Sequence, residues 1–235
     1  ACVDHAPTDP RIFYCETLEN GIQLLLVQDP DAKESAAAMY VAVGSEDDPK
    51  GYEGLAHFLE HMLFIGTEKY PDVDALSDYV SAHGGAYNAF TARDHTQYFF
   101  SVKPDYFSQG LDIFMSFFVS PLFSQEFVDR ERHAVNSEFM MHLKEDGWRQ
   151  YNLSSITGSP SHPANRFQIG NLETLSEKPA GALRNELIKF YQKHYSSNKM
   201  YFVAVSPDPI EQYKNMVKSQ LSQIKRADQK EESKG

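Results

Sequence analysis

Two histidines and a glutamate stand close together in the stretch His57-Phe58-Leu59-Glu60-His61. Residues four apart lie on the same face of a helix, so His57 and His61 can bind one metal ion together. Neutral imidazole is a favoured zinc ligand, and the carboxylate of Glu60 lies near the same face, where it can take a proton from a water molecule. This order, HxxEH, inverts the HExxH pattern of zinc peptidases. The stretch therefore predicts a hydrolytic zinc centre.

The residues around this motif favour a metal site over the alternative, a pair of surface histidines on an ordinary helix. The motif is flanked by apolar side chains, among them Leu55, Ala56, Met62, Leu63, Phe64 and Ile65. Polar groups placed among apolar neighbours need partners, and a metal ion supplies one.

A catalytic zinc ion usually has three protein ligands and a water molecule, so a third ligand must come from another element. Glu131, Glu138 and Glu145 are seven residues apart, nearly two helical turns, and would share one face of a long helix. An acidic stripe facing solvent is the alternative, but apolar neighbours such as Val135 indicate that part of this helix is buried. Spacing does not choose among the three glutamates, and His142 fits equally well.

Composition limits the class of protein. Of 235 residues, 41% are hydrophobic, which indicates a real core in one large domain or two small ones. The net charge of −11 disfavours nucleic acid as a partner and favours cationic ligands and metal ions. The longest apolar run, 35–43, is too short to span a membrane and predicts a buried strand.

The sequence has two cysteines, Cys2 and Cys15, which are too few for a four-thiolate zinc site or a disulfide framework. They allow a single disulfide bond. We favour free thiols.

Strand and helix patterns come in blocks, which predicts an α+β fold rather than a doubly wound α/β fold. Asn20-Gly21, between two β-rich runs, predicts a hairpin. The predicted strands are 12–17, 22–28, 35–43, 87–91, 96–102 and 200–205. The predicted helices are 55–65, 72–82, 103–119, 124–143, 148–156, 179–195 and 210–224. We expect a loop at 158–163, one domain over 1–224, and a charged tail or interdomain linker over 225–235.

These motifs, taken together, resemble the N-terminal catalytic domain of the pitrilysin–insulysin (inverzincin) metallopeptidases. Residues 54–64 are similar to the central signature of that family nearly residue for residue, and the similarity extends over almost the whole chain. The other matching segments are 66–71, 83–85, 88–91, 131–132, 136–138, 162–163, 170–171, 174–175 and 195–198.

The resemblance implies a role for each residue of the centre. His57, His61 and Glu138 would bind one Zn²⁺ per chain, and Glu60 would be the general base. Glu131 would be a second carboxylate that supports catalysis from beside the metal. The resemblance gives no role to Glu145. It also implies a mixed, largely antiparallel sheet packed against helices.

Peptide substrates would bind along an edge strand formed by Asn88, Ala89 and Phe90, as the resemblance implies. Members of the family carry several such domains, so the expected partners are the remaining domains of the same peptidase or a partner half. No nucleic acid partner and no membrane span are expected. The compartment stays open, since bacterial relatives are often periplasmic and animal ones largely cytosolic. The alternatives to an endopeptidase domain are a non-catalytic assembly subunit and a zinc-holding peptide-binding module inactive on its own.

Overall fold

Six strands form one sheet in this computed structural model, which describes residues 3–157, 159, 162 and 165–227. The strand order is β1-β2-β6-β3-β5-β4. Every neighbouring pair is antiparallel except β2 and β6, so the prediction of a mixed, largely antiparallel α+β fold is confirmed. The strands are β1 (Ile12–Thr17), β2 (Gln23–Gln28), β3 (Ser35–Val41), β4 (Ala86–Thr91), β5 (Thr96–Val102) and β6 (Met200–Ser206).

β1 and β2 form the hairpin that Asn20-Gly21 predicts. Gly21 has φ +94, a conformation that favours glycine, and its N–H donates to the carbonyl of Leu18. The third predicted strand is shorter than expected because β3 ends at Val41, where its pairing with β5 and β6 ends.

The helices are α1 (Leu55–Leu63), α2 (Ala75–Ala82), α3 (Phe107–Val119), α4 (Gln125–His142), α5 (Asp146–Ile156), α6 (Ala182–His194) and α7 (Lys214–Leu221). Some begin later than predicted. Pro104–Tyr106 forms a tight 3-10 turn ahead of α3, and Gly181, with φ +82, precedes α6. α2 begins at Ala75, directly after Asp74, rather than at the predicted position 72.

Two predicted segments are only partly described. Of the loop at 158–163, only 159 and 162 are described, and of 225–235 only the first three residues. The carbonyl of Lys225 accepts a bond from Ser197 N–H, and Ala227 N–H donates to Ser196 Oγ. These first residues of the predicted tail are therefore attached to the domain.

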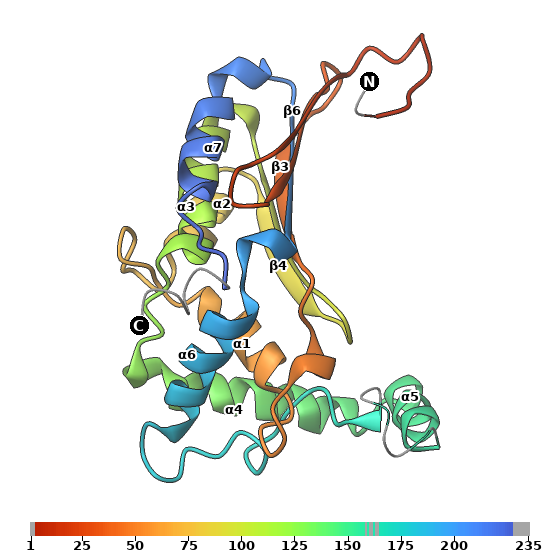
Figure 1. Ribbon diagram of the computed structural model, residues 1–235, viewed down its shortest axis with the longest axis vertical. Coiled ribbons are helices and arrows are strands. Elements are labelled where there is room, and N and C mark those ends of the chain that lie inside the picture. Colours follow the sequence, from red (N-terminus) through yellow and green to blue (C-terminus); the bar gives the residue numbers. More distant parts are fainter. Residues whose placement is uncertain (1–2, 158, 160–161, 163–164, 228–235) are drawn as a thin grey trace.

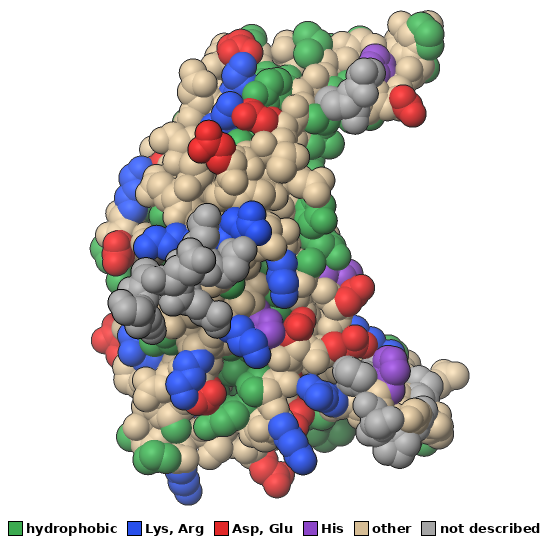
Figure 2. All heavy atoms as spheres, viewed as in Figure 1, with side chains coloured by type: hydrophobic (Ala, Val, Ile, Leu, Met, Phe, Trp, Pro, Cys, Tyr) green, Lys and Arg blue, Asp and Glu red, His purple; other side chains and the backbone are tan. Residues whose placement is uncertain are grey.

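One face of the sheet is buried beneath helices, with α2, α3 and α7 lying along it (Figure 1). Burial alternates along β3, and its inward side chains meet aromatic residues of α3 such as Phe114 and Phe118. The opposite face forms the concave side of a crescent (Figure 2). A hollow of about 430 Å³ on this face is lined by apolar residues of β3 and β6 and by Phe99 and Asn88.

Cys15 on β1 is disulfide-bonded, so the preference for free thiols is wrong. Cys2, the other cysteine of the sequence, lies outside the described residues. Spacing along the chain could not predict whether Cys15 forms a disulfide bond. Among the described residues, no helix is both long enough and apolar enough to cross a membrane.

Candidate metal centre

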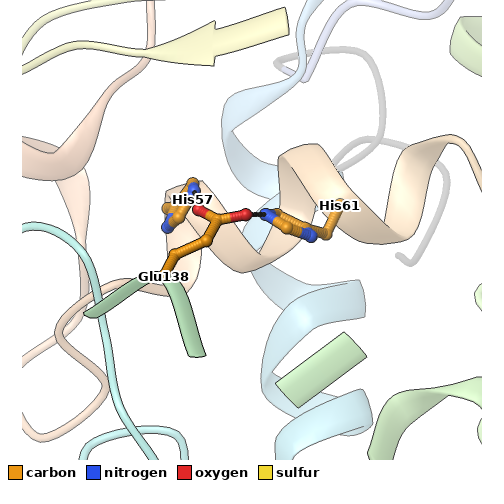
Figure 3. Close-up of side chains that lie close together, drawn as sticks. All are labelled: His57, His61 and Glu138. Atoms are coloured by element: carbon orange, nitrogen blue, oxygen red, sulfur yellow. Dashed lines mark ion pairs between the residues drawn. The ribbon is translucent and has the colours of Figure 1, made fainter. Parts of the chain in front are cut away.

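His57 and His61 project from α1 toward Glu138 of α4 (Figure 3). Nε2 of His57 lies 3.3 Å from Oε2 of Glu138, and Nε2 of His61 lies 3.3 Å from Oε1. Two atoms that bind one tetrahedral zinc ion at its usual bond lengths are roughly 3.3 Å apart. Within the described part of the chain, these three residues are the only His, Cys, Asp and Glu group whose geometry suits a metal ion.

The second ring nitrogen of each histidine is also held. Nδ1 of His57 lies 2.8 Å from the carbonyl oxygen of Ile169, and because a carbonyl only accepts, Nδ1 must carry the proton. Nδ1 of His61 lies 3.4 Å from Oε2 of Glu131. Both rings therefore present an unprotonated Nε2 toward Glu138 when neutral. Histidines that ligate metals are typically oriented in this way, so the residues present fit a zinc ion.

The helix packing explains which carboxylates reach the histidines. Val128, Glu131 and Val135 are buried on one face of α4, and Glu138 continues that face one turn later. α4 ends at His142, so Glu145 is no longer on its face. Glu145 instead lies 3.3 Å from Nδ1 of His142.

The charges of the centre are strongly coupled. When the rings of His57 and His61 are protonated, their Nε2–H groups donate to Glu138, and these hydrogen bonds hold the pKa of Glu138 well below its usual range. Burial alone would lower the pKa of His61, but hydrogen bonds to Glu131 and Glu138 outweigh it and raise the pKa to about 9. Burial acts to raise the pKa of Glu131, but hydrogen bonds from His61 and Arg130 outweigh this effect and hold the pKa below its usual range. The carboxylates thus stabilise positive charge at the position where a metal would lie.

Glu60 is buried beside this centre, and burial raises the pKa of its carboxyl group. Its Oε2 accepts a 2.6 Å hydrogen bond from Oγ1 of Thr91, the last residue of β4. A carboxylate with a raised pKa is better matched to exchanging protons near neutral pH. This contact of Thr91 was not predicted, because nothing in the spacing of the sequence connects Thr91 to Glu60.

A cleft of about 300 Å³ joins these groups. It is lined by the three candidate ligands and Glu60, by residues 88–91 of β4, and by His142, Trp148, Gln168 and Ile169. The ring of Trp148 packs against that of His142 at a tilt of 37°, with centroids 4.2 Å apart. His142 lines the cleft wall and is not part of the ligand group. Ile169 contributes its main-chain carbonyl oxygen. Every residue has this group, so the sequence could not predict the contact.

β4 is an edge strand of the sheet and borders the cleft. The N–H of Ala92 donates to the carbonyl of His95 at 2.7 Å, and bonded pairs alternate in an antiparallel ladder. The main chains of Phe90 and Asn88 are therefore directed toward β5, and that of Ala89 toward the free edge. There the N–H of Ala89 donates to Oδ1 of Asn88 at 2.9 Å. Of the three predicted substrate-binding residues, Ala89 offers its main chain, whereas Asn88 and Phe90 offer side chains.

Comparison with known proteins gives consistent matches. The model of the insulinase family, peptidase family M16, matches residues 23–161, and that of the M16 inactive domain matches residues 182–235. The chain is 44% identical to the peroxisomal insulin-degrading enzyme-like 1 of Arabidopsis thaliana, over 92% of this chain and 23% of that protein. It is 40% identical to human insulin-degrading enzyme, over 94% of this chain and 22% of that protein.

Protease 3 of Escherichia coli is 39% identical, over 92% of this chain and 22% of its own length. The crystal structure of pitrilysin superposes with a TM-score of 0.90 at 38% identity, covering 95% of this chain and 24% of that chain. The chain therefore spans about a quarter of the length of these proteins.

Proposed function

Because the chain belongs to the insulinase family of metallopeptidases (peptidase family M16), we propose that it is a zinc-dependent endopeptidase domain that hydrolyses small peptides and is part of a longer enzyme. The observation that carries this proposal is the His57–His61–Glu138 group beside the buried carboxylate of Glu60. The intact set of metal-binding side chains argues against a non-catalytic assembly subunit.

The residues of the proposed centre have distinct tasks. His57, His61 and Glu138 would hold Zn²⁺, and Glu131 orients His61 through Nδ1. The ion would supply Lewis-acid chemistry, making water more acidic and polarising the peptide carbonyl. The free edge of β4 at Ala89 would pair with the main chain of the peptide and bring its scissile bond to the cleft.

Glu60 carries the protons of the reaction. The water oxygen attacks the carbonyl carbon while Glu60 takes one of the water protons. The carbon–nitrogen bond then breaks, and Glu60 returns that proton to the leaving amine. Thr91 holds the carboxylate of Glu60 in place for both transfers.

The test compares the chain with its Glu60→Gln variant, which keeps the size of the side chain and removes the base. We expect both proteins to contain the same amount of zinc, and hydrolysis of a quenched fluorescent peptide to fall by about 10²–10⁴-fold in the variant. The assay is run on the chain and on the longer protein that contains it. Full hydrolysis by both Glu60→Gln forms would contradict the mechanism. Zinc and peptide binding without cleavage by either unmodified form would indicate a peptide-binding module.

A further inference from the structure

Asp48 is a buried acidic residue that the proposed reaction does not use. Its side chain is 2% exposed, in the loop that leads to α1. Oδ2 accepts a 2.7 Å hydrogen bond from the N–H of Gly54, and Oδ1 accepts one of the same length from the N–H of Ala56. The carbonyl of Asp48 accepts a bond from Arg166 at 2.8 Å. One residue thus holds the first turn of the helix that carries His57 and His61.

Keeping a charged carboxylate at this buried position reduces the free energy of unfolding, because the charge loses its hydration. Burial raises the pKa of Asp48 to about 7, whereas an ordinary helix-capping aspartate at a surface keeps its charge hydrated. Two short bonds from main-chain N–H groups fix both the position and the rotation of the helix start. A single exposed cap would fix only the position.

A second contact restrains the same turn. Gly54 has φ +96, and a Cβ on it would come within 2.2 Å of Cα of Gly170. This close approach places the carbonyl of Ile169 where it accepts the Nδ1–H of His57 at 2.8 Å. A rotation of the first turn would therefore move the ring of His57 away from both Ile169 and Glu138.

We propose that Asp48 is a positioning residue for the metal centre, fixing the first turn of α1 so that His57 and His61 face Glu138. The inference rests on the proposed function, since it assigns Asp48 to the same zinc site. Asp48 touches neither metal nor substrate and acts through the helix.

The experiment measures zinc affinity of the full chain by competition with a chromophoric chelator. Asp48→Asn keeps the shape but turns an NH₂ group toward one of the two N–H donors, and Asp48→Ala removes both acceptors. Leu221→Ala is the control for a general loss of stability, because Leu221 is fully buried at the end of α7, a helix that packs mainly on α3. We expect the Asp48 variants to bind zinc about tenfold or more weakly. Leu221→Ala should stay within about twofold of the unmodified chain at a temperature where all are folded.

Equal zinc affinity in the Asp48 variants and the unmodified chain would overturn the inference. The inference would also fail if Leu221→Ala lost as much zinc affinity as the Asp48 variants at a matched loss of unfolding free energy. The ¹⁵N shifts of the His57 and His61 rings in the metal-free chain give a second readout. Asp48→Asn should change those of His57, and unchanged shifts would overturn the inference even if the chain bound no zinc. Failure of zinc binding by the unmodified chain would instead count against the proposed function.

Discussion

Glu131 and Glu138 lie on the same face of α4 but meet His61 at different ring nitrogens. Glu138 faces the Nε2 atoms of both histidines, where a metal would bind, and Glu131 faces Nδ1 of His61 only. We therefore propose different roles for the two carboxylates, Glu138 as a metal ligand and Glu131 as a support for the ligand His61.

Substitution should separate these two roles. We expect Glu138→Gln to remove zinc from the purified chain, because a ligand is lost. Glu131→Gln should weaken zinc binding by about 10–100-fold, because His61 loses only its orienting partner. Glu126→Gln, exposed in the first turn of α4, is the control and should leave affinity unchanged. Equal zinc affinity in the Glu131 and Glu138 variants would argue against this division.

The raised pKa of His61 predicts the pH dependence of zinc binding. His61 must lose its proton to bind a metal, and in the metal-free protein its pKa is about 9 rather than the ordinary 6.5. Below that pKa, zinc has to displace the proton, so the affinity should rise about tenfold per pH unit up to roughly pH 9. Chelator competition at several pH values measures this. An affinity that levels off near pH 6.5 would show that His61 is not held by the two carboxylates.

The centre could be predicted from the sequence only in part. The spacing of His57, Glu60 and His61 predicted a metal-binding helix, because helical periodicity is local. The choice among Glu131, Glu138 and Glu145 depends on where α4 crosses α1 and where α4 ends. The spacing of the glutamates predicts neither position. The family resemblance selected Glu138, which lies against both histidines. The roles of Asp48 and Ile169 depend on contacts between segments far apart in sequence.

At the scale of elements, we propose that β4 connects substrate binding to catalysis. Its free edge is bordered by the cleft, and its last residue, Thr91, holds Glu60. The sequence located this strand to within one residue, and the other strands were predicted nearly as well. The position of β6 between β2 and β3 was not predicted, because pairing between distant segments leaves no local pattern.

Removing one N–H from the free edge tests the substrate role of β4. Ala89→Pro deletes an N–H that is directed away from β5, so the pairing with β5 should persist. Peptide binding, measured by fluorescence anisotropy in a Glu60→Gln background, should weaken by about tenfold or more as a main-chain bond is lost. Ala89→Val, which keeps the N–H and suits a strand, should bind normally. Unchanged binding by Ala89→Pro, with zinc retained, would exclude pairing at this edge.

At the scale of the whole molecule, the cleft is lined by α1, α4 and α5 and by a single strand, β4, at the edge of the sheet. The chain spans about a quarter of the length of its relatives. We expect a cleft bordered by one strand edge to hold a peptide from one side only and to exclude water poorly, which would limit catalysis by this chain alone.

We therefore expect the rest of the longer protein to raise activity. Adding that part in trans should increase kcat/KM for a fluorescent peptide by at least about tenfold, because positioning and water exclusion improve together. The zinc content of this chain should stay the same. The control is the same addition to the Glu60→Gln variant, which should stay inactive. No gain in activity would mean that this domain contains everything the reaction needs.

The most direct test of the account is the zinc content of the chain purified without added metal, measured by elemental analysis. The account predicts about one zinc ion per chain, and none in the double variant His57→Ala/His61→Ala. An unmodified chain that contains no zinc, even after supplementation, would contradict the assignment of His57, His61 and Glu138 as a metal centre, and with it the proposed mechanism.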